Sequence, residues 1–226
     1  MNNISFEQYR KIDLTILSVL TVVSEGLVTL ATDKWFVGVP FAISTSLLFI
    51  LITMMRWGVY AVIPAVLGGA VRAFASGAEP KIYLIYALGN AFCVLTFLAL
   101  YALGKERVRK SIPLLISYSV LSYIYVAFGR WLVSLIFEPS ILTLPAYLMT
   151  DAVSLLFVTV VLVLIRNTDG MIEDQKAYVI RINTETEKAA ARYSDEDDLE
   201  EIYDDPNYLD GIYDDDDGDE PTDDNQ

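Results

Sequence analysis

Histidine is absent from the 226 residues of this chain, and cysteine occurs only once. The lack of histidine excludes Ser–His–Asp and Cys–His catalysis, HExxH zinc sites and haem held by imidazole. One cysteine can form neither an internal disulfide nor a thiolate metal cage. The apolar stretch around Cys93 favours a small buried hydrophobic residue. Because most of the usual catalytic groups are missing, we expect neither an enzyme nor a bound cofactor.

Basic residues are also missing from one part of the chain. Residues 194–226 contain 17 Asp and Glu and no Lys or Arg, which leaves 13 of the 30 acids against all 16 bases in residues 1–193, a net charge of +3. Such a polar, acidic stretch cannot bury enough apolar surface to fold. We therefore predict a disordered acidic tail over 194–226, which is either simply solvated or a docking strip for a basic partner.

Long apolar stretches dominate the rest of the sequence. A helix needs about 20 mostly apolar residues to cross a bilayer, and the first residues lack the pattern of a cleaved secretory signal. The sequence predicts an all-α membrane protein with a six-helix transmembrane domain over 1–168 and a short juxtamembrane segment over 169–193. The six expected spans are 12–31, 36–55, 59–76, 82–103, 111–137 and 141–165.

Two of the expected spans have distinctive faces. In the first, small and hydroxyl residues share one helical face, as is typical of helix packing in membranes; they are Thr15, Ser18, Glu25, Gly26 and Thr29. That face contacts either other helices of the same chain or a separate subunit. In the second span, residues 47–55 are almost wholly apolar, which favours a lipid-facing helix.

The basic residues of the loops predict an orientation. Eight Lys and Arg lie on the side of the N-terminus, against two or three on the other side. Because cytoplasmic loops are enriched in these residues, we expect both termini in the cytoplasm of a bacterium, with the body crossing its plasma membrane several times.

Five polar residues interrupt five of the apolar spans at a similar depth, nearer the outer face; they are Glu25, Arg72, Asn90, Arg130 and Asp151. Charges inside a membrane are costly and face the protein interior or a water-filled cavity, with a partner. The five residues therefore form either buried ion pairs or an outward-open pocket. A pocket would gain aromatic walls from residues that include Tyr86, Tyr123 and Tyr147.

The region of 10–168 resembles the substrate-binding S components of energy-coupling factor (ECF) transporters, which import micronutrients. The resemblance lies in six helices with a polar outer half, and in Arg56-Trp57-Gly58-Val59-Tyr60-Ala61 followed by Pro64 and Gly68-Gly69. It implies a transmembrane coupling subunit and two ABC-type ATPases as partners. That family docks its coupling subunit through Ala-x-x-x-Ala on the first helix, where this chain has Ser18, Val22 and Gly26. The bulk of Val22 departs from that motif.

Two functions follow as hypotheses. The first is a substrate-capture subunit that binds a small polar or zwitterionic micronutrient, with Arg72 and Arg130 on its acidic group, Glu25 and Asp151 on an amine or hydroxyl, and Asn90 supplying amide hydrogen bonds. The second is a membrane scaffold, such as an MreD-like cell-envelope assembly protein, that acts through its acidic tail. Neither hypothesis involves nucleic acid, and both place the chain in a lipid bilayer.

Overall fold

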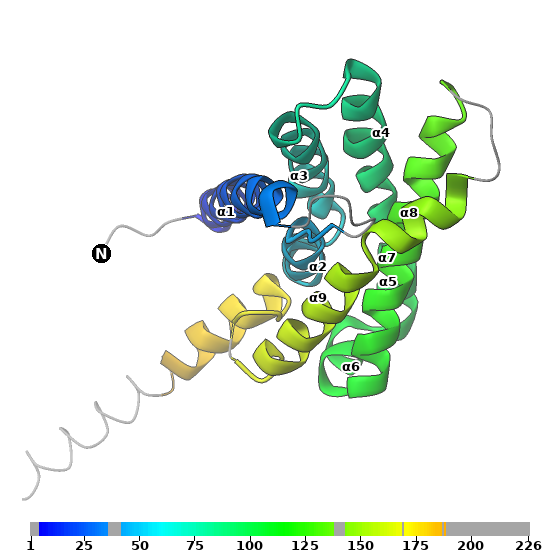
Figure 1. Ribbon diagram of the computed structural model, residues 1–226. Coiled ribbons are helices and arrows are strands. Elements are labelled where there is room, and N and C mark those ends of the chain that lie inside the picture. Colours follow the sequence, from blue (N-terminus) through cyan, green and yellow to red (C-terminus); the bar gives the residue numbers. More distant parts are fainter. Residues whose placement is uncertain (1–4, 36–41, 138–142, 169, 187, 189–226) are drawn as a thin grey trace, which may run out of the picture. The chain divides into compact units, whose positions relative to one another are not determined.

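A computed structural model describes residues 5–35, 42–137, 143–168, 170–186 and 188 of this chain (Figure 1). The described residues are helical or lie in turns and short connections, and no strand occurs among them. The chain divides into two compact units, Met1–Ala177 and Tyr178–Gln226. The predicted acidic tail lies outside the described residues, so its disorder stays a prediction.

The helices follow one another with short connections. In order they are α1 (Phe6–Trp35), α2 (Ser46–Trp57), the 3-10 turn η1 (Gly58–Ala61), α3 (Val62–Ala75), α4 (Pro80–Ala91), the 3-10 turn η2 (Phe92–Leu95), α5 (Thr96–Leu103), α6 (Lys105–Lys110), α7 (Ile112–Ser134), α8 (Leu144–Thr150) and α9 (Ala152–Ile165). Residues 175–186 are also helical, and within the second unit the central guanidinium carbon of Arg181 lies 5.5 Å from the centroid of the Tyr178 ring.

Four helical stretches of the described chain are long and apolar enough to cross a membrane; they are Phe6–Trp35, Ser46–Ala75, Pro80–Leu103 and Ile112–Ser134. The pair α8 and α9, bent by 46° at Asp151, makes a fifth if it is counted as one span. These helices are compatible with a membrane protein, whereas the predicted number of six spans is not confirmed.

The stretch Ser46–Ala75 reverses direction at Gly58. A straight helix would separate Ser46 from Gly68 by about 33 Å, at 1.5 Å per residue. Instead, a Cβ atom built on Gly68 would lie 2.7 Å from Cβ of Ser46. The turn is made by Gly58, whose φ of 64° is a backbone conformation that favours glycine. Helices α2 and α3 are therefore the two arms of a hairpin, and Ser46–Ala75, although long and apolar enough, is not one straight helix.

Helix α2 lies at the centre of the first unit, in contact with α1, α3, α7 and α9. Ten of its twelve residues are buried, and Leu51, Met54 and Met55 are wholly inaccessible. The prediction that residues 47–55 face lipid is therefore wrong. Lipid tails and a protein core are equally apolar, so hydrophobicity does not distinguish the two surroundings.

The predicted packing face of α1 is confirmed in part. Ser18, Glu25 and Thr29 are buried against the same chain, and Thr21 joins them, whereas Thr15 is exposed. The buried face is therefore rotated slightly from the predicted one. Apolar residues such as Leu27, which is 65% exposed, cover the other side of the helix.

Glycines allow α4 to approach its neighbours closely. A Cβ atom on Gly89 would lie 2.6 Å from Cα of Arg130, and one on Gly129 would lie 2.5 Å from the carbonyl oxygen of Gly89. Helices α4 and α7 therefore cross backbone to backbone, a geometry that small residues make available in membrane bundles. This crossing brings Asn90, next to Gly89, beside Arg130.

A polar clip (Asp13, Arg56 and Trp57) joins the N-terminal part of α1 to the C-terminal end of α2. The carboxylate of Asp13 accepts hydrogen bonds from Nε and Nη2 of Arg56, at 2.9 and 2.7 Å, and from the indole nitrogen of Trp57. Arg56 also donates to the carbonyl oxygens of Gly170 and Met171. The segment that follows α9 is therefore fastened to the end of the bundle.

Candidate functional site

The five polar residues expected from the sequence come together, and Asp151 lies at their centre. Its Oδ1 lies 2.8 Å from Nη1 of Arg72, and its Oδ2 accepts a hydrogen bond from Nη1 of Arg130. Asp151 stands at the break between α8 and α9, while the two arginines come from α3 and α7. One carboxylate thus ties three helices together.

Asn90 connects this ion pair to the backbone of α3. Its Oδ1 accepts a hydrogen bond from Nε of Arg130 at 2.9 Å, and its Nδ2 donates to the carbonyl oxygen of Ala65 at 3.2 Å. Asn90 is wholly inaccessible and Arg130 is 3% exposed. Both ends of the amide are therefore satisfied inside the bundle, as a buried polar network requires.

The ring of Tyr86 interacts with both guanidinium groups. The central carbon of Arg72 lies 5.1 Å from the ring centroid, and that of Arg130 lies 4.4 Å from it. A cation over an aromatic face is attracted to its electrons, and more strongly where water is excluded. Tyr86 therefore stabilises the two neighbouring positive charges.

Glu25 has a different partner from the other four residues. Its Oε2 accepts hydrogen bonds from the backbone nitrogens of Thr45 and Ser46, at 2.7 and 2.8 Å, and from the hydroxyl groups of Ser44 and Thr45. The side chain of Thr45, the N-cap residue, makes no capping bond of its own. Glu25 therefore caps α2, and its other oxygen lies 4.0 Å from Nη1 of Arg72.

A small cavity of about 10 Å³ lies within the network, bordered by residues that include Asn90, Arg130, Asp151 and Tyr123. That volume is about the least that holds a single water molecule. The hydroxyl group of Tyr123 is buried there and makes no hydrogen bond to the described residues. The centre of the network is thus closed around its own charges.

A second cavity, of about 190 Å³, lies beside Arg72 and Tyr86; we call it the Arg72 cavity. It is bordered by Thr29, Thr32, Asp33, Ala42, Ile43, Arg72, Ala73, Ser76, Ile82, Tyr86 and Thr150. Hydroxyl groups, a carboxylate and a guanidinium line it together with a few aliphatic side chains. Convergent polar groups around such a hollow are typical of a small-molecule site.

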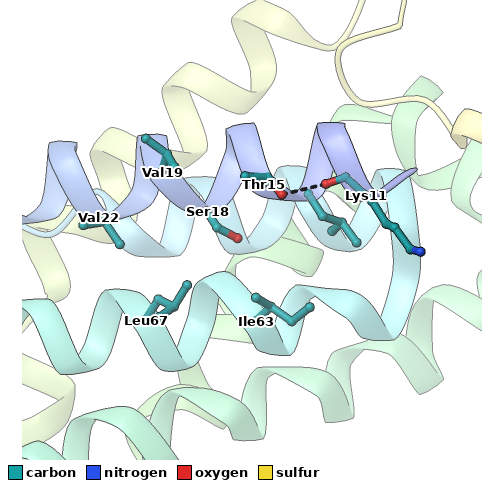
Figure 2. A pocket seen from close by; sticks show the side chains of 8 residues that line it. Lys11, Thr15, Ser18, Val19, Val22, Ile63 and Leu67 are labelled. Atoms are coloured by element: carbon teal, nitrogen blue, oxygen red, sulfur yellow. Dashed lines mark hydrogen bonds between the residues drawn. The ribbon is translucent and has the colours of Figure 1, made fainter. Parts of the chain in front are cut away.

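A third hollow, of about 510 Å³, is an apolar groove between α1 and α3 (Figure 2). It is lined by Lys11, Leu14, Thr15, Ser18, Val19, Val22, Ile63 and Leu67. Two of the three residues predicted to couple to a partner, Ser18 and Val22, border this groove. The third, Gly26, packs against Val71 of the same chain, where a Cβ atom would lie 3.4 Å from the valine side chain.

The structure brings most of the predicted ligand residues into one network, but only Arg72 and Tyr86 among them border the Arg72 cavity. Tyr147 is half-buried on α8 and borders none of the three hollows. The sequence reasoning did not assign Thr32, Asp33, Ser76 or Thr150 to a site. The spacing of Thr29 and Thr32, which follow Glu25 and lie one turn apart, indicates that the polar face continues to the end of α1.

No family model, curated protein or solved structure matches this chain. Its function is therefore argued from the geometry of these residues.

Proposed function

We propose that this chain is a binding subunit in the bacterial plasma membrane that captures a small polar molecule for import. The Arg72 cavity is the main support for the proposal. It places a guanidinium, an aromatic ring and several hydroxyl groups around a hollow at the end of otherwise apolar helices. A rigid network behind Arg72 preorganises that guanidinium, which reduces the ordering cost of binding.

Capture alone does not drive a molecule across a membrane, so delivery needs a second component. We assign it to an ATP-driven module with a transmembrane coupling subunit and ABC-type ATPases. The α1–α3 groove offers such a subunit an apolar surface that includes Ser18 and Val22. Both chain termini would then be cytoplasmic, as the loop charges predict, and the Arg72 cavity would open outward.

Glu25 and the groove residues of α1 contact different parts of the molecule, which supports this arrangement. The carboxylate of Glu25 is directed toward the N-terminus of α2, while Ser18 and Val22 border the groove toward α3. One helix can therefore serve an internal polar network and a partner surface with different residues. The two roles therefore do not compete for the same side chains.

The proposal is tested by a thermal-shift measurement on the purified full-length protein against a panel of micronutrients. A ligand that binds only the folded state raises the melting temperature by mass action. We expect at least one compound to do so, and the shift should shrink in Arg72→Gln. The exposed variant Glu79→Gln is the control and should behave like the unmodified protein. A folded sample that responds to no compound would contradict the proposal.

A membrane scaffold is the second candidate, because one observation favours it. Arg130 donates hydrogen bonds to both Asn90 and Asp151 around a cavity of about 10 Å³, as expected of a structural network. Deleting residues 194–226 separates the two functions. A scaffold that acts through the acidic tail would lose partner recruitment and show no ligand, whereas a capture subunit would keep its ligand-dependent thermal shift.

A further inference from the structure

Two arginines and two carboxylates lie beside the Arg72 cavity, and they are not paired one to one. Glu25 accepts hydrogen bonds from two backbone N–H groups at the start of α2 and from two hydroxyl groups. The positive end of the helix dipole also stabilises its negative charge. That carboxylate is thus held mainly by the start of α2, and its ion pair with Arg72 is long, at 4.0 Å. Arg72 and Arg130 then share a single carboxylate, that of Asp151. The four charges sum to zero, but the one short ion pair of Arg72 is shared with Arg130.

Part of the guanidinium group of Arg72 is available to a ligand. Its ion pairs with Asp151 and Glu25 both use Nη1. Within the described part of the chain, no hydrogen bond or ion pair uses its Nε or Nη2, and the residue borders the cavity. A guanidinium presents five N–H donors in a fork that matches a carboxylate. The free edge of Arg72 is therefore suited to an anionic group.

A buried hydroxyl group beside Arg72 points to the same ligand. Thr29 is 6% exposed, and its Oγ1 makes no hydrogen bond to the described residues although it borders the cavity. A buried polar atom without a partner is costly, so a ligand that supplies one is favoured. Thr32, one turn further along α1, brings a second hydroxyl group to the same wall.

A negative charge, opposite to that of Arg72, lies near the end of α1. Asp33 borders the cavity, is exposed, and makes no ion pair among the residues that the structure describes. It would repel a ligand that carried only negative charge and attract an ammonium group. The cavity thus combines a cationic wall at Arg72 with an anionic edge at Asp33.

Size limits the ligand further. Sites for drug-sized molecules measure about 300 to 1,000 Å³, whereas this cavity measures about 190 Å³. We infer, on the basis of the proposed function, that the captured molecule is a small zwitterion whose anionic group binds Arg72 and Thr29 and whose ammonium group binds Asp33.

A matched set of probes on one carbon frame tests the charge class. β-Alanine is the zwitterion, propionate carries only the anion, propylamine only the cation, and propionamide neither. Amino acids with longer and shorter carbon chains serve as further zwitterionic probes. Binding to the purified full-length protein is measured by thermal shift and calorimetry. Zwitterions should bind at least tenfold more tightly than the one-charge compounds, because each charge-assisted hydrogen bond contributes about a factor of ten or more.

Three variants assign the contacts. Arg72→Gln should remove binding of zwitterions and of propionate. Asp33→Asn changes an exposed side chain and should preserve the fold. It should weaken the binding of zwitterions about tenfold, so that they bind no more tightly than propionate. Thr29→Val keeps the shape of the side chain and should weaken the binding of both zwitterions and propionate. Glu79→Gln, an exposed carboxylate outside the cavity, is the control and should change none of these values.

The outcomes separate this inference from the function on which it rests. If a cationic, neutral or purely anionic compound binds best, or if Asp33→Asn leaves the preference unchanged, the zwitterion assignment fails while capture of a small molecule stands. If neither these probes nor the micronutrient panel bind a folded sample, the proposed function fails, and the assignment fails with it.

Discussion

The carboxylate of Glu25 lies 2.8 Å from the backbone nitrogen of Ser46, and this contact fixes the start of the central helix α2. An acid from the middle of one membrane-length helix thereby supplies the N-terminal cap of another. The first N–H groups of a helix have no partner within it, and here Ser46 is only 2% exposed. The contact explains how a carboxylate is retained in an apolar stretch.

Glu25→Gln keeps the shape of the side chain but removes its charge. We expect the free energy of unfolding to fall by about 1.5–3 kcal/mol, the usual value for hydrogen bonds to a charged group. Thermal or denaturant unfolding in detergent measures the change. Glu79→Gln, on an exposed carboxylate that is 3.4 Å from Lys81, is the matched control and should have almost no effect. An equal loss in both variants would contradict the capping role.

Asp151→Asn leaves two buried arginines without their shared carboxylate. The expected loss of stability is about 3–5 kcal/mol, because breaking a buried pair exposes an uncompensated charge to an apolar interior. A double-mutant cycle with Arg130→Gln should show strong coupling, so that the double variant loses less than the sum of the single ones. Additive losses would show that the two residues do not act as a pair.

Gly89→Ala tests the close crossing of α4 and α7. The added methyl group would lie 2.6 Å from Cα of Arg130, and overpacking of this kind costs about 1–3 kcal/mol. Gly26→Ala is the control in another apolar helix, because its nearest neighbour would lie at an ordinary 3.4 Å. The control should unfold at nearly the same temperature as the unmodified protein. Tolerance of both substitutions would overturn the backbone-to-backbone crossing.

Asp13→Asn should loosen the polar clip at the beginning of α1. The carboxylate accepts two hydrogen bonds from Arg56 and one from Trp57, so we expect a loss of about 1–3 kcal/mol. Hydrogen exchange should become faster in residues 5–13 and in the segment from Gly170 that Arg56 also contacts. Unchanged exchange in both segments would show that the clip does not hold them.

Glu106 in α6 gives a prediction about pH. Partial burial acts to raise its pKa, but hydrogen bonds and charge from Arg109 and Lys110 outweigh it, so the pKa lies below its usual value. A lowered pKa in the folded state stabilises it above the unfolded pKa, and this contribution disappears as the pH falls through the folded pKa. Glu106→Gln should therefore reduce the loss of stability below about pH 4.3, the ordinary Glu value. An unchanged acid dependence of the melting temperature would contradict it.

The sequence was sufficient to predict that Glu25, Arg72, Asn90, Arg130 and Asp151 would meet. Charges in apolar helices must find partners, and the loop pattern placed these residues at one depth. Their partners could not be predicted, because several pairings satisfy the same charges. The structure gives Asp151 both arginines and gives Glu25 the backbone of α2.

The Arg72 cavity depended even more on tertiary structure. Its borders come from four helices and from the connection before α2, and several of its residues, such as Asp33 and Thr150, are unremarkable in the sequence. A cavity is set by how side chains of distant segments pack, which no local pattern records.

By itself, then, the sequence determined an apolar helical body, an acidic C-terminal stretch and a set of polar residues that had to be shared between helices. It determined these because hydrophobicity and charge act residue by residue. Only the tertiary structure decided that α2 lies at the centre and that Arg72 and Tyr86 border the cavity. An apolar helix is equally stable against lipid or protein, and a charge is satisfied by any partner that packing brings within reach.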